Sequence, residues 1–249
     1  MKIIACYSNK GGVGKTAASV NLAYVCAGLG WRTLLCDLDP QGASGFYFRV
    51  KPSKSLKKKT FFRDEQTVIE AIRASDYEDL DLLPANLGFR DFDIFLSGVK
   101  KSRIQLKNTL DGLASDYDVI LLDCPPNISL LSENVFRAAN LVVVPVIPTT
   151  LSMRSLDQLH AFFEKRGYSK KKILPFFSMV QKGKNLHKDT IAELSDKYRR
   201  MCKTQIDFST DIERMGLHRE PAMAFAGKKS PASAYIDLWL EIEESAGLR

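Results

Sequence analysis

The sequence predicts an α/β fold in which a mostly parallel, twisted sheet carries helices on both faces. Short apolar segments of strand length alternate with longer segments whose apolar residues recur at helical spacing, which is the pattern of β-α-β units. Residues 118–122 (DVILL) are apolar almost without interruption, as expected for a strand buried on both faces of a parallel sheet.

The first elements are expected around a glycine-rich turn. Residues 2–8 (KIIACYS) have the length and apolar content of a buried strand. Residues 15–29 follow as a helix, because their apolar residues recur at helical spacing and Gly30 can end it. Residues 33–37 (TLLCD) form the next strand. A basic loop over 49–63, which contains KPSKSLKKK, then interrupts the alternation.

The alternation continues over the rest of the chain. The remaining strands are expected at 80–83, 118–122, 141–146 and 173–180. Helices are expected at 67–74, 102–114, 129–139, 152–166, 189–200 and 232–244. No internal repeat or long linker divides the sequence, so we expect one domain over residues 1–249.

Composition excludes several classes of protein. With 45% hydrophobic and 26% charged residues, the 249-residue chain is neither disordered nor too short for a substantial core. No apolar run reaches the roughly 18 residues of a spanning helix, and the N-terminus lacks the features of a signal peptide. The five cysteines are scattered without a CxxC pair, which indicates reduced, buried thiols in a cytoplasmic protein.

Positive charge is concentrated in one part of the chain. The net charge is +7, and residues 165–203 contain twelve Lys or Arg against three acids. Four more basic residues follow, namely Arg214, Arg219, Lys228 and Lys229. A solvated helical face and a surface for an anionic partner both explain such a run.

Residues 8–16 (SNKGGVGKT) connect the first strand to the first helix and have the composition of a phosphate-binding loop. Glycines let the backbone approach phosphates and turn its N–H groups inward, and the helix adds its positive N-terminal end. Lys15 would contact the β and γ phosphates of ATP, and the Thr16 hydroxyl would bind Mg²⁺. The predicted nucleotide-binding residues are Lys10, Gly11, Gly12, Val13, Gly14, Lys15, Thr16 and Ala17.

Three carboxylates end predicted strands near this loop. Asp37 and Asp39 follow the second strand with the spacing that puts both on one side, and Asp123 ends the apolar run that begins at 118. Because Mg²⁺ takes oxygen ligands and keeps waters, we expect these carboxylates to hold the ion through water.

These segments resemble the ParA family of partition ATPases, within the deviant Walker A (ParA–MinD) superfamily of P-loop ATPases. The resemblance covers nearly the whole chain and rests on KGGVGKT, LLCDLDPQGAS, the long segment YDVILLDCPPNISLLSENVFRAANLVVVPVIPTTLS, and SPASAYIDLWLEI. It implies that Lys10 reaches across a dimer interface to the partner's nucleotide. It also implies that Asp39 activates the attacking water, that Asp123 is the Walker B carboxylate, and that Asp37 supports the metal's water shell.

The resemblance further implies a function for the whole chain. ATP·Mg²⁺ would drive a sandwich homodimer that binds DNA nonspecifically, and a partner protein encoded nearby would stimulate slow hydrolysis and release. The cargo would be a plasmid, a chromosome or a protein assembly, and the protein would be cytoplasmic and nucleoid-associated. Many members carry an N-terminal DNA-reading domain, which is not expected here. The DNA contacts are predicted at Lys182, Lys184, Lys188, Arg199, Arg200 and Lys203.

Two other functions use the same phosphate loop. A small-molecule ATP-dependent ligase would fit the loop alone, although DLDPQG disfavours it. A MinD-like spatial regulator would end in a basic amphipathic helix that binds membrane. The final segment here, IDLWLEIEESAGLR, has mainly acidic polar positions, so no membrane contact is expected.

Overall fold

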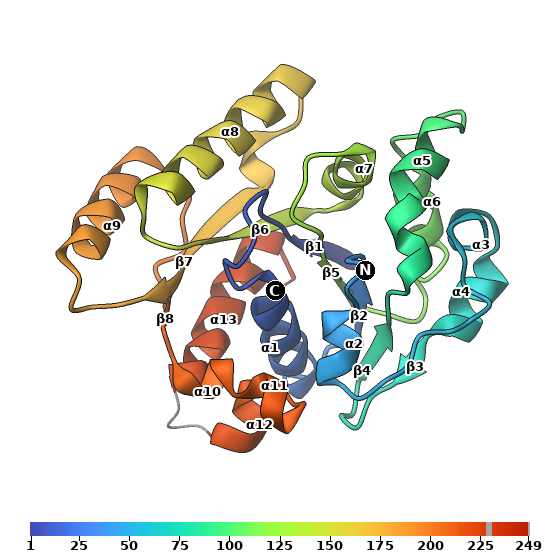
Figure 1. Cartoon of the computed structure of the whole chain (residues 1–249), viewed down its shortest axis with the longest axis horizontal. Helices are drawn as coiled ribbons and strands as arrows, with labels where there is room; N and C mark the ends of the chain where they lie inside the picture. Colours follow the sequence, from blue (N-terminus) through green and yellow to red (C-terminus); the bar gives the residue numbers. More distant parts are fainter. Residues whose placement is uncertain (228–230, 249) are drawn as a thin grey trace.

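The computed structural model describes residues 1–227 and 231–248. They form an eight-stranded sheet in the order β3-β4-β2-β5-β1-β6-β7-β8, parallel except for the short β3–β4 pair (Figure 1). The strands are β1 (Lys2–Cys6), β2 (Thr33–Asp37), β3 (Arg73–Ala74), β4 (Leu80–Leu83), β5 (Val119–Asp123), β6 (Leu141–Val146), β7 (Ile173–Val180) and β8 (Gln205–Asp207).

Helices connect the strands. The α-helices are α1 (Lys15–Gly28), α2 (Ala43–Tyr47), α3 (Lys58–Arg63), α4 (Glu65–Ala71), α5 (Phe92–Ser97), α6 (Gln105–Asp111), α7 (Leu130–Ala138), α8 (Thr150–Arg166), α9 (Asn185–Lys197), α10 (Thr210–Glu213), α11 (Met215–His218), α12 (Ala222–Ala226) and α13 (Ala234–Ala246). Short 3₁₀ segments are η1 (Leu87–Asp91), η2 (Lys170–Lys172) and η3 (Pro231–Ser233). Among the described residues, no helix is both long enough and apolar enough to cross a bilayer.

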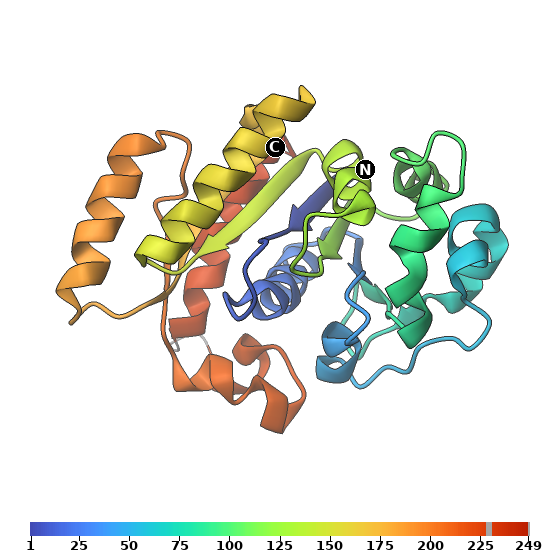
Figure 2. The same cartoon turned by 45° about the horizontal axis from the view of Figure 1, so that its top comes forward.

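The sheet separates two hydrophobic cores, and the alternation along each strand explains why. In β1, Ile3 faces a core shared with α7 and α8, whereas Ile4 faces a core shared with α1 and α13. Figure 2 shows α7 and α8 on one side of the sheet and α1 with α13 on the other. The predicted fold class is therefore confirmed. All five cysteines are buried and free of disulfides, as predicted.

Two predictions in the first half of the chain are wrong in part. The segment 49–63 is not a loop throughout, because Phe61 and Phe62 are buried and fold its end into α3. The helix predicted at 67–74 ends at Ala71, and residues 73–74 instead pair with β4. The short elements α2, α5 and η1 were not predicted, since segments of five or six residues carry little periodic signal.

Differences in the second half concern boundaries and one edge strand. The helix predicted at 189–200 begins earlier, at Asn185, because His187 lies buried in its first turn. It ends before Tyr198, whose hydroxyl donates to Asp157 on α8. The helix predicted at 102–114 is the shorter α6. Strand β8 was missed because it is three residues long.

Candidate nucleotide-binding site

The glycine-rich loop leaves the carboxyl end of β1, at the centre of the sheet, and its backbone faces open space. Gly12 and Gly14 have φ of 70° and 88°, a left-handed conformation that glycine adopts without strain. A Cβ at Gly11 or Gly12 would meet no atom within 4 Å. The loop runs directly into α1, so its N–H groups and the helix N-terminus lie at the same end of the sheet.

The two lysines of the loop lie in different surroundings. Lys15 is 8% exposed, and its Nζ donates to the Lys10 carbonyl at 3.1 Å, across the concave side of the loop. The Nζ of Lys10 instead donates to the Ser152 hydroxyl at 3.1 Å, in the first turn of α8. Lys15 therefore lies within the loop, whereas Lys10 extends from it toward a neighbouring helix.

Asp37 and Asp123 end adjacent strands and are paired in register. Both are buried, at 0% and 1% exposure. The Asp123 carboxylate accepts hydrogen bonds from Ser19 at 3.2 Å and Ser44 at 2.9 Å, and Thr16 is near enough to lower its pKa. Asp37 accepts from the backbone N–H groups of Asp39 at 3.0 Å and Ser44 at 3.1 Å. The sequence-predicted metal residues are therefore brought together beside the phosphate loop.

Burial perturbs both carboxyl groups. Desolvation, followed by repulsion from Asp123, raises the pKa of Asp37 well above its usual range. Desolvation also raises the pKa of Asp123 to about 6, although hydrogen bonds from Thr16, Ser44 and Ser19 oppose the change. A nearby cation would relieve this cost. Hydroxyl and carboxylate oxygens fit Mg²⁺, although no three His, Cys, Asp or Glu side chains among the described residues could hold an ion by themselves.

Asp39 lies two residues after Asp37, in the turn that follows β2, and it is only partly buried. Its carboxylate accepts from the N–H of Gln41 at 3.0 Å, and its carbonyl accepts from Gly42 at 2.9 Å. Gly42 has a φ of 65°, which suits glycine in this tight turn. The N–H of Asp39 donates to the Asp37 carboxylate at 3.0 Å, so this turn is tied to the buried pair.

A small cavity that the sequence did not predict adjoins the loop on the α1 side. It has a volume of about 70 Å³, and its lining includes Gly14, Ala17, Met179 and Phe208. Met179 has a φ of 55°, where the pairing of β7 with β8 shifts register. A single methionine within an apolar strand gives no sequence signal of this irregularity.

The six predicted DNA contacts are exposed, and they fall into two groups. Lys182, Lys184 and Lys188 lie where β7 ends and α9 begins, whereas Arg199, Arg200 and Lys203 lie beyond the other end of α9. A helix of 13 residues separates the groups by about 20 Å. Lys182 also pairs with Asp207 at 2.6 Å. Lys228 and Lys229 are outside the described residues.

Comparisons with known proteins agree with this arrangement. A family model described as an AAA domain matches residues 1–175. The chain is 32% identical to the sporulation initiation inhibitor protein Soj of Bacillus subtilis over 97% of this chain and 98% of Soj. It is 33% identical to the chromosome partitioning protein ParA of Myxococcus xanthus over 63% of this chain, and it spans 56% of that protein's length.

Two solved structures have the same fold. One is cobyrinic acid a,c-diamide synthase from Mycobacterium smegmatis with a bound ATP analogue and magnesium, with a TM-score of 0.78, 25% identity, and coverage of 99% of this chain and 97% of the other. The second is a putative plasmid partition protein from Borrelia burgdorferi bound to AMPPNP, with a TM-score of 0.78, 24% identity and 98% coverage of both chains.

Proposed function

The chain belongs to the ParA family of P-loop ATPases, and from this premise we propose that it is an ATP-dependent partition or positioning ATPase that acts as a dimer on DNA. The observation that carries the proposal is the site itself. A buried Lys15 lies in a glycine loop, and Ser19 of the helix that follows this loop donates to Asp123, which is paired with Asp37. This combination serves nucleotide phosphates and a divalent ion together.

ATP and Mg²⁺ are the cofactors that this site fits. The loop N–H groups and the start of α1 would bind the phosphates, and Lys15 would exchange the Lys10 carbonyl for phosphate oxygens. Thr16 would bind Mg²⁺ directly, while Asp37 and Asp123 would hold its water shell. Mg²⁺ supplies positive charge that neutralises the phosphates. The cavity lined by Met179 and Phe208 would widen to take the base beside α1.

Hydrolysis requires a group that orients water toward the terminal phosphate. Asp39 is suited to this role because it is less buried than Asp37 and Asp123 and lies on the turn next to them. Lys10 would contribute its charge to the nucleotide of a partner subunit, as an arginine finger does. In this chain Lys10 is held by Ser152, so it is directed away from its own loop.

Exposed apolar side chains on the nucleotide face support dimerisation. Ile128 follows β5 and is 43% exposed, and Leu151 begins α8 beside Ser152 and is 65% exposed. Loops after parallel strands meet at one edge of the sheet, so both lie on the edge from which the phosphate loop also leaves. A sandwich dimer would bury them together with the nucleotide.

Nonspecific DNA binding would use the basic residues around α9. Each group of three cations in one subunit gives few phosphate contacts, whereas a dimer doubles them. Binding through phosphates alone carries no sequence preference and weakens steeply with salt. A partner protein would then release the dimer by stimulating hydrolysis.

The test is the molecular mass in solution with ATP·Mg²⁺, with ADP and without nucleotide. Asp39→Ala should bind ATP, hydrolyse it slowly and run as a dimer by light scattering, because a water-positioning group acts mainly in the transition state. Lys15→Ala, as the control, should stay monomeric. An Asp39→Ala protein that binds ATP and remains a monomer at every concentration would refute the dimer.

The similarity to a cobyrinic acid a,c-diamide synthase keeps a small-molecule ligase as a second candidate. A ligase consumes ATP only when its acceptor is present. A partition ATPase hydrolyses ATP slowly alone and faster with DNA and a partner protein. The full-length identity to Soj, 32%, favours the partition function.

A further inference from the structure

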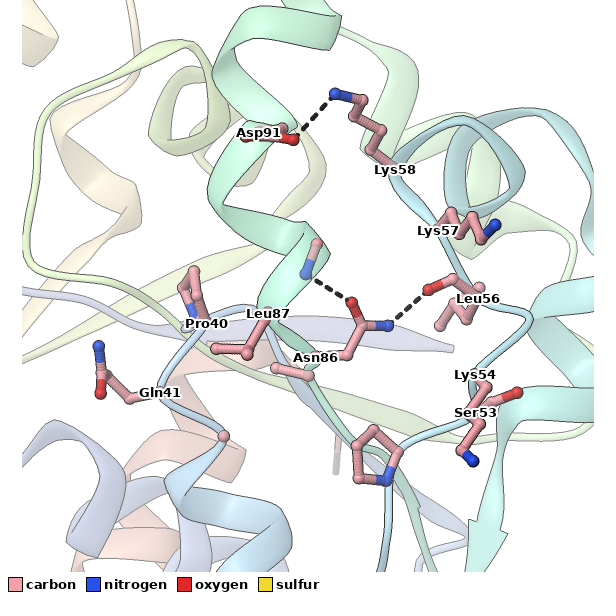
Figure 3. A pocket seen from close by; sticks show the side chains of 14 residues that line it. Pro40, Gln41, Ser53, Lys54, Leu56, Lys57, Lys58, Asn86, Leu87 and Asp91 are labelled. Carbon is pink, nitrogen blue, oxygen red and sulfur yellow. Dashed lines mark hydrogen bonds and ion pairs between the residues drawn. The ribbon is translucent and has the colours of Figure 1, made fainter.

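A second, larger hollow lies next to the turn that carries Asp39. It has a volume of about 740 Å³ and lies between residues 40–42 of that turn, residues 52–58 of the basic segment and residues 85–91 after β4. Figure 3 shows Pro40 and Gln41 on one side of this pocket and Ser53, Lys54, Leu56 and Lys57 on the other. The basic segment, which the nucleotide site does not use, thus forms one wall of the pocket.

The basic wall is fixed in place by specific contacts. The side-chain amide of Asn86 donates to the Leu56 carbonyl, and its oxygen accepts from the Gly88 N–H at 2.8 Å. Leu56 is 1% exposed, and Lys58 pairs with Asp91 at 2.9 Å. Contacts on both sides of the pocket therefore hold the wall next to the loop after β4.

The pocket has an excess of positive charge. Three lysines and one acid line it, and that acid, Asp91, is paired with Lys58. Lys54 and Lys57 are exposed, and within residues 1–227 and 231–248 neither has an ion-pair partner. An occupant that carries negative charge would satisfy these two cations.

The remaining lining is largely apolar. Leu56, Ala85, Pro40 and Pro52 contribute to it, and Leu87 presents a side chain that is 66% exposed. An apolar-lined hollow suits side chains that can enter it and leave water behind. The phosphates of a DNA duplex lie on a stiff, hydrated exterior, so they do not fill such a hollow. The combination favours a peptide with both acidic and apolar side chains.

We propose that this pocket docks an acidic, apolar segment of a partner protein. The proposal rests on the function proposed above, because the expected consequence of docking is a change in ATP hydrolysis. An occupant would contact Pro40 and Gln41, and the N–H of Gln41 donates to the Asp39 carboxylate at 3.0 Å. Docking would therefore act on the position of the water-activating group without touching the nucleotide.

The experiment uses a fluorescein-labelled twelve-residue peptide that alternates Glu and Leu, titrated with the full chain with and without ATP·Mg²⁺. We expect saturable binding that weakens with salt, and a change in the hydrolysis rate that saturates with it. Lys54→Glu with Lys57→Glu should weaken binding about tenfold or more, because two attractive charges become repulsive. Lys51→Glu with Lys59→Glu is the matched control. It lowers the net charge of the same segment by the same amount, but neither residue lines the pocket.

Four outcomes would overturn the pocket assignment: no saturable binding, equal weakening by the two double variants, equal affinity for a Lys–Leu peptide, or tighter binding of a DNA duplex that depends on Lys54 and Lys57. Binding without any change in hydrolysis would overturn the link to Asp39. ATP binding and ATP hydrolysis without the peptide are measured in the same samples. If the chain neither binds nor hydrolyses ATP, the proposed function fails. If both are normal and the peptide does not bind, only the pocket inference fails.

Discussion

The nucleotide end of the sheet and the basic layer around α9 both depend on charged side chains, but they hold them differently. At the nucleotide end, Lys15 is 8% exposed and Asp123 is 1% exposed, and each has defined hydrogen-bond partners. Around α9 the cations are exposed, and the side chain of Lys182 is 76% accessible. An unpaired buried charge is costly, so a buried charged side chain must stay beside its hydrogen-bond partners. Water solvates an exposed charged side chain, which can therefore change its position at little cost.

This comparison predicts its largest effect for Lys15→Ala. The variant should bind ATP·Mg²⁺ about 1000-fold more weakly, because it loses a largely desolvated cation that faces the phosphates. Titration with a fluorescent ATP analogue measures it. Lys188→Ala, which removes an exposed lysine from α9, is the matched control and should leave affinity unchanged. If Lys15→Ala and Lys188→Ala bound ATP with equal affinity, the buried lysine would contribute no more to ATP binding than the exposed one.

The second effect should be on chemistry alone. Asp39→Ala should hydrolyse ATP about 100-fold more slowly while binding it with near-normal affinity, because the carboxylate acts on the attacking water. Steady-state phosphate release and ATP titration give the two quantities. Asp116→Ala changes an exposed carboxylate that precedes β5, away from the nucleotide site, and should retain normal turnover. Wild-type turnover in Asp39→Ala would show that another residue orients the water.

A third effect concerns sharing of Lys10 between subunits. Lys10→Ala should bind nucleotide but hydrolyse it poorly. Mixed with Asp39→Ala, it should regain part of the activity, since one site of the mixed dimer keeps Asp39 and receives Lys10 from the other subunit. Phosphate release from the mixture measures the recovery. If mixed dimers form but ATP hydrolysis does not recover, Lys10 acts on the nucleotide of its own subunit and not on that of the partner.

Buried carboxyls also predict how stability depends on pH. Burial raises the pKa of Asp123 from 3.8 to about 6, so the folded, metal-free protein binds that proton more tightly than the unfolded chain. The resulting stabilisation is complete below about pH 4 and is lost as the pH rises through about 6.

Denaturation in EDTA between pH 4.5 and 7.5 tests this prediction. Asp123→Asn should lose about 2 kcal/mol less than wild type over this range, because the amide does not titrate. Asp116→Asn, at an exposed carboxylate, should behave like wild type. Parallel pH profiles for wild type and Asp123→Asn would contradict the burial argument.

The smallest effects are expected around α9. Lys182→Ala with Lys184→Ala, and Arg199→Ala with Arg200→Ala, remove cations from opposite ends of that helix. The pair that contacts DNA should reduce the log–log salt slope by about 0.9 per lost phosphate contact. A pair whose removal leaves the slope unchanged makes no phosphate contact. Slopes are measured for the ATP-bound protein on two unrelated sequences, and unequal effects on the two sequences would contradict phosphate-only binding.

The sequence indicates the positions of residues at the nucleotide end more closely than the bounds of the outer helices, for a physical reason. Lys15, Thr16 and Asp123 must occupy fixed positions on a strand, a turn and a helix start, so their spacing is readable. The bounds of α9 differ from the predicted ones, and His187 is buried in its first turn while Tyr198, just beyond its end, donates to Asp157. Those are tertiary contacts, which local periodicity does not encode.

The large pocket was unpredictable for a related reason. Its basic wall was predicted only as a basic loop, because the sequence does not reveal that Asn86, thirty residues later, binds the Leu56 carbonyl. The cavity beside the phosphate loop depends on the left-handed Met179, for which a strand-like sequence gives no warning. Both places contain a feature, one long-range hydrogen bond and one left-handed residue, that local sequence patterns do not indicate.

The bond between Lys10 and Ser152 has a kinetic consequence. In the proposed dimer, Lys10 must first leave Ser152, whose hydroxyl also contacts Thr149 at 3.1 Å. That release breaks one side-chain hydrogen bond, and such side chains rearrange far faster than two chains can meet in solution. Ser152 therefore directs Lys10 away from its own loop without delaying assembly. We expect the initial rate of assembly to rise with the square of the concentration of ATP-bound chain.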